Sequence, residues 1–364
     1  MKKNLIVGQS GGPTAVINGS LYGVVTEAMR HTEEIGEIYG MINGIEGFLN
    51  GHMMDMRSLI ETNELALLRT TPGSYLGSCR YKLPEDLNDP VYPLLFNKFT
   101  SHGIGYFFYI GGNDSMDTVS KLSRYAKKIN SDIRFIGVPK TIDNDIFGTD
   151  VTFGFHTAVD IATDALDRLH TTANSHSRIL LCEIMGNKAG WLTLSAGIAG
   201  GADIILIPEI PYDIDKVCKS VQKRSESGKN FSIVAVAEGC FDKEEAKMKK
   251  KERTRLRQEA GITTATNRIA AQIQQKTGLE ARVCVPGHML RGGSPSAYDR
   301  VLATQFGVYA AELIREEHYG MSVAKVGGTI TANKLDDIAG KTKFVSPDDQ
   351  LVQTARNLGI SFGD

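Results

Sequence analysis

Short runs of apolar residues recur along the chain, and longer amphipathic stretches separate them. The runs are NLIVG at 4–8, IGYFFYI at 104–110, RFIGV at 134–138, ILLCEI at 179–184, DIILI at 203–207, FSIVAVA at 231–237 and ARVCV at 281–285. Apolar strands that alternate with helices are typical of parallel sheets covered on both faces. The pattern predicts an α/β fold, in which ligands collect at the carboxyl ends of the strands.

The length of 364 residues exceeds the comfortable size of a single core, so two lobes are expected. An apolar content of 41% is that of an ordinary globular protein, and 38 glycines suit a chain rich in binding loops. The formal net charge of -1 gives no general attraction to nucleic acid or to an anionic membrane. Any anion site must therefore be built locally.

The cysteines and the N-terminus bear on localisation. The five cysteines are scattered and form no C-x-x-C pair, which argues against a disulfide framework and a zinc site and favours buried thiols in a reducing cytosol. The opening MKKNLIVGQSGG leads directly into a strand, and no apolar run approaches the ~18 residues of a membrane span. We expect a cytoplasmic protein without export signal or membrane segment.

Polar, glycine-bearing loops follow most of the expected strands. They are GQSGGPTAVINGS, GGNDS, PKTIDND, MGNKAG, AEG and PGHMLRGGS. Because the carboxyl ends of parallel strands share one edge of a sheet, we interpret these loops as one extended active-site cleft.

Two of the loops are candidate anion sites. Gly11 and Gly12 precede Pro13, where we expect a helix to open, and the surrounding sequence matches neither the dinucleotide fingerprint nor the P-loop. A simple glycine turn is the alternative. In the second loop, Gly112 leads into a helix, and Asp114 places a carboxylate where an anion would bind. From local pattern alone, Asp114 is equally well explained as a helix N-cap.

Charged residues cluster after the third expected strand and in one loop before it. The segment PKTIDND offers Lys140, Thr141, Asp143 and Asp145, which supply a base, a magnesium ligand and a cation for phosphoryl transfer. The alternative is a structural turn at Asp143. Arg80, beyond a glycine loop, suits the oxygens of a transferring phosphoryl group, or is simply a surface residue.

A further set of side chains fits a sugar phosphate, with arginines on the phosphate and a carboxylate on hydroxyls. Each of them, taken singly, also fits a surface ion pair or a structural histidine. The set comprises Arg178, Glu238, Arg282, His288 and Arg291.

A strongly basic stretch, residues 243–257, interrupts the pattern. It is expected to be a solvated helical insertion. A mobile cationic lid over a phosphate site is the alternative, and nucleic-acid binding is not expected because the stretch lacks aromatic residues and any recognisable module.

Taken together, the motifs resemble the phosphofructokinase family. SGGPTAVIN, LGSCR, GGNDS, PKTIDND, SHSR, MGN, AEG, EAR and GHMLRGGSPSAYDR occur in the family's order from about Gly8 to Arg300. The resemblance implies two Rossmann-like three-layer lobes with mainly parallel sheets. Residues 1–154 and about 290–338 would form a phosphoryl-donor lobe, and residues 155–289 and about 339–364 a sugar-phosphate lobe. It also implies a homodimer or homotetramer.

The resemblance implies transfer of a phosphoryl group to the 1-hydroxyl of fructose 6-phosphate, a glycolytic step. Asp143 would be the base, with Thr141 beside it and Arg80 on the transferring group. The donor site would include Gly11, Gly12 and Gly112. The sugar phosphate would be held by Thr141, Asp143, Asp145, Met185, Gly186, Asn187, Glu238, His288 and Arg291, with Arg178 and Arg282 reaching in from a neighbouring subunit. Asn187 is assigned by position only, because the family commonly has arginine there.

The resemblance also bears on the donor. ATP-using members have glycine at the positions of Asp114 and Lys140, whereas pyrophosphate-using members have aspartate and lysine. Asp114 would occupy the place of a nucleotide α-phosphate, and Lys140 would neutralise the leaving phosphate. We therefore expect reversible transfer from pyrophosphate, with an ATP-dependent enzyme and a non-catalytic sugar-phosphate sensor as alternatives.

Magnesium is the expected cofactor. Asp145 is one candidate ligand, and Asn113 is a second, although its amide brings no charge and many members have aspartate there.

Overall fold

The chain forms two sheets, each within its own compact unit, in a computed structural model that describes residues 2–315 and 320–364. The first unit comprises 1–142, 146–157 and 291–342, and the second comprises 143–145, 158–290 and 343–364. Residues 1 and 316–319, which the expected donor lobe includes, lie outside the described residues. The assignment of donor and sugar phosphate to separate lobes stays a prediction.

The sheet of the first unit has seven strands in the order β11-β10-β5-β4-β1-β2-β3. The strands from β2 to β10 in this order pair in parallel, and the edge strands β3 and β11 pair antiparallel. Their bounds are β1 (Lys3–Gln9), β2 (Ile35–Met41), β3 (Met53–Asp55), β4 (Ile104–Gly111), β5 (Arg134–Pro139), β10 (Gly320–Val326) and β11 (Thr329–Lys334).

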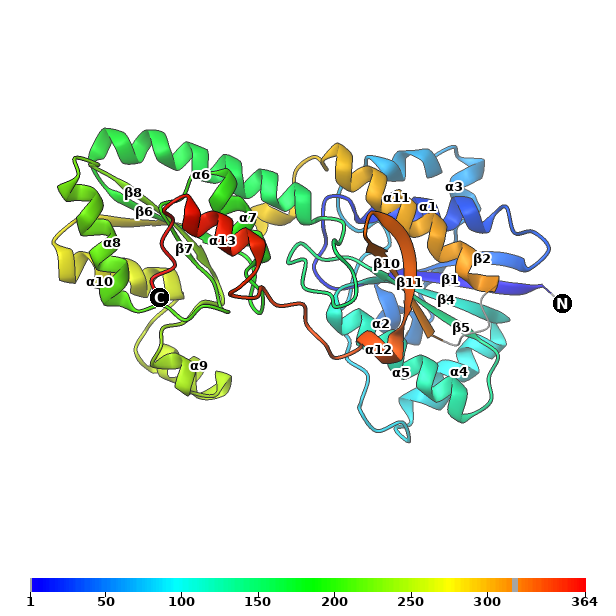
Figure 1. Ribbon diagram of the computed structural model, residues 1–364. Helices are drawn as coiled ribbons and strands as arrows, with labels where there is room; N and C mark the ends of the chain where they lie inside the picture. The colour runs from blue at the N-terminus through cyan, green and yellow to red at the C-terminus, as the bar shows by residue number, and fades with distance from the viewer. Residues whose placement is uncertain (1, 316–319) are drawn as a thin grey trace. The chain divides into compact units, whose positions relative to one another are not determined.

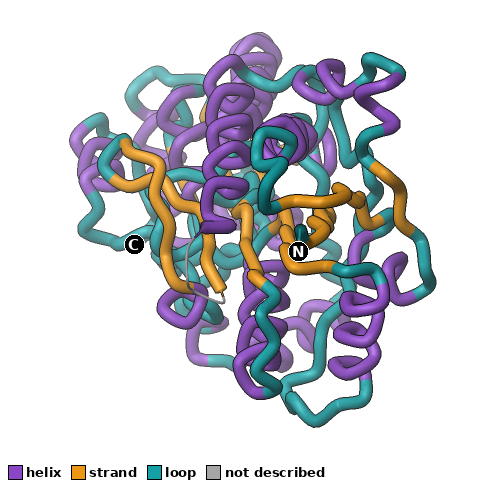
Figure 2. The backbone as a smooth tube through the Cα atoms, turned by 90° about the vertical axis from the view of Figure 1, so that its right-hand side faces the viewer, coloured by secondary structure: helices purple, strands orange, loops and turns teal. Residues whose placement is uncertain are grey.

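Helices cover both faces of this sheet (Figure 1, Figure 2). They are α1 (Ile17–Ala28), α2 (Gly44–Leu49), α3 (Ser58–Glu61), α4 (Val91–Ser101), α5 (Asn113–Lys128), α11 (Ala297–Glu312) and α12 (Leu335–Ile338), with 3-10 turns η1 (Leu65–Arg69) and η4 (Leu313–Arg315). The core is aromatic where α4 meets the sheet: Phe99 is fully buried and stacks on Phe48 at 5.2 Å between ring centroids. Met116, Val119 and Leu122 bury one face of α5 as their spacing predicts.

The second unit has a four-stranded, all-parallel sheet in the order β7-β8-β6-β9. The strands are β6 (Ile179–Ile184), β7 (Ile204–Leu206), β8 (Ser232–Ala237) and β9 (Ala281–Cys284). The helices are α6 (Phe155–His176), α7 (Trp191–Ala199), α8 (Ile214–Glu226), α9 (Lys250–Glu259), α10 (Ala265–Thr277) and α13 (Gln350–Asn357), with turns η2 (Glu245–Lys247) and η3 (Gly287–Arg291). Side chains of α8 and α10 pack with the sheet into one apolar core.

The structure confirms the predicted α/β class with mainly parallel sheets, and a strand lies at each apolar run named above. One helix boundary was wrong. The helix expected to open at Pro13 begins at Ile17, although its apolar face, including Leu21 and Val24, is buried as expected. Within the described ranges, no helix is both long enough and apolar enough to span a membrane.

Candidate active site

The loop after β1 turns sharply at Gly11, whose φ of +77° is a conformation that favours glycine. The Gly11 N–H donates to the carbonyl oxygen of Cys79 at 3.1 Å, and the Ser78 hydroxyl donates to the Gly11 carbonyl at 2.6 Å. These bonds hold the Gly11 backbone against the segment that carries Arg80. Arg80 itself is exposed.

Lys140 ties the loops after β1, β4 and β5 together. Its ammonium group donates to the carbonyl oxygen of Gly12 at 2.6 Å, and its backbone N–H donates to Gly111 at 2.9 Å. A Cβ atom on Gly112 would lie 3.5 Å from the Lys140 carbonyl oxygen. The side chain is only 3% exposed. The predicted cation and the predicted glycine loops therefore meet at the carboxyl edge of the first sheet.

Gly12 lies against the side chain of another predicted site residue. A Cβ atom at this position would lie 2.5 Å from a terminal nitrogen of the Arg291 guanidinium. Arg291 belongs to the first unit, at the end of η3. The structure thus places this arginine against the glycine loop of the expected donor site, and its contact with a sugar phosphate stays a prediction.

Asp114 is not a helix N-cap, so that interpretation was wrong. The N-cap of α5 is Gly112 in an extended conformation, and the helix begins at Asn113. Asp114 lies in the first turn, where its carboxylate forms an ion pair with Lys82 at 3.1 Å. Both side chains are largely exposed. The sequence analysis missed Lys82, although it stands only two residues after Arg80 in SCRYK.

The segment after β5 passes from the first unit to the second between Ile142 and Asp143. Asn144 has a left-handed φ of 51°, as expected of an asparagine in a tight turn. Thr141 accepts a hydrogen bond at its carbonyl oxygen from the Thr152 hydroxyl at 2.9 Å. Asp145 is 5% exposed and accepts at its carbonyl oxygen from a backbone N–H of the C-terminal segment at 2.9 Å. The turn is therefore rigidly held on both sides of Asp143.

Two loops meet at the carboxyl edge of the second sheet. Met185, Gly186 and Asn187 follow β6, and Glu238 follows β8 directly. A Cβ atom on Gly239 would overlap the backbone of Asn187, so glycine is required for the loops to approach this closely. A cavity of about 360 Å³ opens beside them, and its lining residues are Asn187, Lys188, Pro208, Glu209, Glu238, Gly239, Phe241, Lys250, Arg253, Thr254, Arg257 and Phe344.

Arg178 and Arg282 lie elsewhere in the second unit. Arg178 precedes β6, and Arg282 pairs with Leu180 near the start of the same strand. Both guanidiniums contact Glu280, Arg178 at 2.7 Å. Each of the two arginines stands at the amino end of a strand, and their predicted contact with a sugar phosphate stays a prediction. Within the second unit they do not join Glu238.

His288 follows β9 in the turn η3 and is exposed. Cys284, at the end of β9, lies opposite Cys182 of β6 in the parallel register. A hydrogen bond from the Cys182 thiol lowers the pKa of Cys284, while the same bond and burial raise the pKa of Cys182. All five cysteines are free thiols; Cys284 is half-buried and the others are buried, largely as expected.

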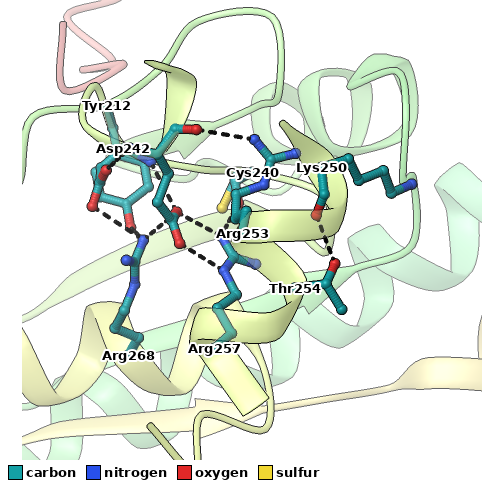
Figure 3. A network of polar contacts seen from close by, with 9 residues as sticks. Tyr212, Cys240, Asp242, Lys250, Arg253, Thr254, Arg257 and Arg268 are labelled. Carbon is teal, nitrogen blue, oxygen red and sulfur yellow. Dashed lines mark hydrogen bonds and ion pairs between the residues drawn. The ribbon is translucent and has the colours of Figure 1, made fainter. Parts of the chain in front are cut away.

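The basic insertion forms η2 and α9, and none of the α9 residues is buried, which agrees with a solvated helix. Its attachment was not anticipated. Glu245, 8% exposed, accepts from Arg257 with both carboxylate oxygens, at 2.8 and 2.7 Å, and from Arg268 of α10 at 2.6 Å (Figure 3). Arg253 stacks over Phe241 at 4.1 Å from the ring centroid. No local periodicity marks these partners, since the network joins residues of different elements.

The described part of the chain contains no group of three or more His, Cys, Asp or Glu side chains arranged to hold a metal ion. Mg²⁺ in phosphoryl transfer keeps several waters and uses one or two carboxylates together with substrate phosphates, so it does not require a cluster of three protein ligands. Asp143 and Asp145 follow Lys140 within five residues of sequence, and Asp114 follows the glycines after β4.

Comparison with known proteins identifies the family. A family model described as phosphofructokinase matches residues 4–314. An ATP-dependent 6-phosphofructokinase of Spirochaeta thermophila is 43% identical, covering 98% of this chain and 96% of the relative. The ATP-dependent 6-phosphofructokinase 3 of Bacteroides thetaiotaomicron is 38% identical, covering 97% and 98%.

The similar solved structures are named for a different phosphoryl donor, pyrophosphate. A pyrophosphate-dependent phosphofructokinase from Nitrosospira multiformis superposes with a TM-score of 0.83 at 28% identity, covering 100% of this chain and 93% of that one. The pyrophosphate-dependent phosphofructokinase from Marinobacter aquaeolei gives 0.82 at 29% identity, covering 99% and 92%.

Glycine loops at the carboxyl ends of parallel strands, here joined by a buried lysine, are typical of α/β enzymes that bind phosphate groups. The chain belongs to the phosphofructokinase family, and it is a transferase of that class.

Proposed function

We propose that this phosphofructokinase transfers a phosphoryl group reversibly from pyrophosphate to the 1-hydroxyl of fructose 6-phosphate, giving fructose 1,6-bisphosphate and phosphate in glycolysis. The observation that carries the choice of donor is the position of Asp114. Its exposed carboxylate stands in the first turn of α5, directly after the glycines that follow β4. A longer nucleotide chain would place another phosphate against this charge, whereas the shorter pyrophosphate ends before it.

The donor is proposed to bind at the first unit. Gly11, Gly12 and Gly112 allow backbone groups to approach phosphate oxygens, and the Lys140 ammonium already lies on the Gly12 carbonyl. A lysine is a compact point charge, which suits a leaving phosphate. Arg80, carried on the loop bonded to Gly11, would stabilise the charge that develops on the transferring group.

The acceptor is proposed to meet Asp143, which would take the proton of the 1-hydroxyl as oxygen attacks phosphorus. Thr141 would lie beside that base. The remaining sugar-phosphate contacts would come from Asp145, Met185, Gly186, Asn187, Glu238, His288 and Arg291, with Arg178 and Arg282 supplied by a second copy in a homodimer or homotetramer. The proposal that a second copy supplies these arginines is supported by their position at the amino ends of strands, away from the carboxyl edge of their own sheet.

Magnesium would neutralise phosphate charge during transfer. Asp145 is the proposed protein ligand, and Asn113, at the start of α5, could add only a neutral oxygen. The enzyme is proposed to be cytoplasmic. The proposed lobes follow the sequence analysis, with the donor on residues 1–154 and about 290–338 and the sugar phosphate on residues 155–289 and about 339–364.

An ATP-dependent phosphofructokinase is the second candidate, and the names of the relatives that are 43% and 38% identical favour it. Under that alternative, the ion pair between Asp114 and Lys82 would neutralise the carboxylate and remove the barrier to a nucleotide. The two candidates therefore differ in the role of one side chain.

The test compares production of fructose 1,6-bisphosphate from fructose 6-phosphate, Mg²⁺ and either pyrophosphate or ATP. We expect turnover with pyrophosphate and little with ATP, and we expect Asp114→Gly to raise kcat/KM for ATP. Asp114→Asn is the matched control that keeps the size but removes the charge, and it should show part of the gain. Preference of the unmodified enzyme for ATP would refute the proposed donor.

A further inference from the structure

The cavity at the carboxyl edge of the second sheet has a wall that the basic insertion supplies. Lys250, Arg253, Thr254 and Arg257 of the α9 segment line it. The facing wall includes Asn187 and Glu238, which the proposed function places on the sugar phosphate. The insertion is therefore part of a candidate site, and not only a solvated excursion from the fold.

The wall is held in place before any ligand binds. The fork between Arg257 and Glu245 joins α9 to η2, and Glu245 in turn accepts from Arg268 of α10. Together with the stacking of Arg253 on Phe241, these contacts fix α9 to the body of the second unit. Lys250, which lines the cavity, donates to the amide oxygen of Asn187 at 2.6 Å. Positioned groups bind with a smaller loss of side-chain entropy than flexible ones. These contacts favour a preorganised wall over a mobile lid.

The charged side chains of the cavity are of two kinds: some are satisfied by contacts that hold the fold together, and others contact uncharged groups. Arg257 is neutralised by Glu245, and the Glu209 carboxylate accepts backbone N–H groups of Gly190 and Val345, so both side chains serve the fold. Lys250 contacts a neutral amide, and Arg253 contacts an aromatic ring.

Lys188 adds a further cation to the lining. Burial lowers the pKa of Arg253, and the nearby charge of Arg257 lowers it further, so an anion beside this guanidinium would be favoured. The cavity combines these cations with Glu238, an acceptor for hydroxyl groups. Its volume of about 360 Å³ is within the range for small-molecule sites. The complementary ligand is a phosphorylated, hydroxyl-bearing molecule.

We propose that Lys250 and Arg253 of the insertion bind the phosphorylated sugar. Lys250 leaves the Asn187 amide and contacts a phosphoryl oxygen. Arg253, stacked on the ring of Phe241, places a second cation beside the phosphate. This proposal rests on the proposed acceptor site, and it is independent of whether pyrophosphate or ATP is the donor. It assigns the insertion a role in sugar-phosphate affinity.

The experiment measures binding of fructose 6-phosphate to the full chain by calorimetry without donor, and the KM for fructose 6-phosphate with whichever donor the unmodified enzyme uses. Loss of a charge-assisted hydrogen bond predicts that Lys250→Ala weakens binding and raises KM by about 10- to 100-fold. Because the contact is present in ground and transition states alike, kcat should change by less than about threefold.

Matched variants separate binding from folding. Lys250→Arg keeps the charge and should retain affinity within about threefold, given that both side chains bind phosphate. Lys251→Ala removes an exposed lysine of the same helix that does not line the cavity, and it should bind like the unmodified enzyme. Arg253→Ala should weaken binding as Lys250→Ala does, whereas Arg255→Ala, which loses an exposed pair with Glu259, should not.

The dependence of fructose 6-phosphate affinity on salt concentration distinguishes a direct contact with phosphate from a purely structural role of Lys250. Binding to the unmodified enzyme should fall more steeply with KCl than binding to Lys250→Ala, because salt screens the contact between lysine and phosphate. Unchanged affinity and KM in Lys250→Ala would overturn the assignment of the insertion while leaving the proposed function intact. Failure of the unmodified enzyme to bind fructose 6-phosphate would refute the proposed acceptor site and this assignment together.

Discussion

Glu245 is the residue on which the attachment of α9 depends, and replacing it by glutamine tests that dependence. The carboxylate is 8% exposed, and its partners Arg257 and Arg268 are 19% and 15% exposed. Glu245→Gln removes the charge that pairs with both arginines, so Arg257 loses its carboxylate partner, whereas Arg268 keeps an ion pair with Asp242 at 3.2 Å. Removing one partner of a buried ion pair costs about 3–5 kcal/mol. Glutamine keeps one acceptor oxygen, so we expect a loss near the lower end, about 3 kcal/mol.

Urea unfolding followed by fluorescence reports the change in the right unit, because the single tryptophan of the chain, Trp191, lies in α7 of the second unit. With a denaturant slope of about 2 kcal/mol/M, a loss of about 3 kcal/mol moves the midpoint down by about 1.5 M. Glu244→Gln is the control, since Glu244 pairs with Lys247 while 75% exposed. Its effect should stay within about 0.5 kcal/mol.

The loss of stability in Glu245→Gln, relative to the unmodified enzyme, should also depend on pH. Burial raises the pKa of the Glu245 carboxyl, but the hydrogen bond from Arg257 and the charges of Arg268 and Arg257 lower it by more, and the net pKa is below the ordinary value of 4.5. A lowered pKa in the folded state adds stability that is fully present above the ordinary value and is lost as the pH falls through the lowered one. The urea midpoints of the unmodified enzyme and of Glu245→Gln should therefore differ most at neutral pH and converge in acid. Equal midpoints for Glu245→Gln and Glu244→Gln at pH 7 would refute the reasoning.

Two further predictions concern the proposed base and the paired thiols. Asp143→Ala should lower kcat by about 10²- to 10⁴-fold while calorimetry still detects fructose 6-phosphate binding, and full activity in this variant would exclude Asp143 as the base. Alkylation of Cys284 by iodoacetamide, followed by mass spectrometry, should proceed at a pH below the ordinary thiol pKa of 9.0, because the hydrogen bond from Cys182 stabilises the Cys284 thiolate. Cys182→Ala should shift that pH profile upward, and an unmoved profile would contradict this account of the pair.

The fold class and the strands could be predicted from sequence because their signal is local. An apolar run such as ILLCEI satisfies a parallel strand buried on both faces, and the observed β6 coincides with it at residues 179–184. The glycine loops were also visible, since glycine marks close approach or unusual dihedral angles at Gly11 and Gly12. Cap geometry was less predictable: Asp114 fits an N-cap by residue type, but the extended conformation of Gly112 starts α5 earlier.

By itself, therefore, the sequence determined the α/β class, the succession of strands and loops along the chain, and the residue types available for phosphoryl transfer. Only the tertiary structure decided which of those residues meet. Lys140 reaches Gly12 across 128 positions of sequence, and Lys250 reaches Asn187 across 63. Arg178 and Arg282 share Glu280 at the amino edge of their sheet, away from the loop of Glu238. The physical reason is that periodicity and turn chemistry act over a few residues, whereas contacts between loops depend on strand order, which packing of the whole unit selects.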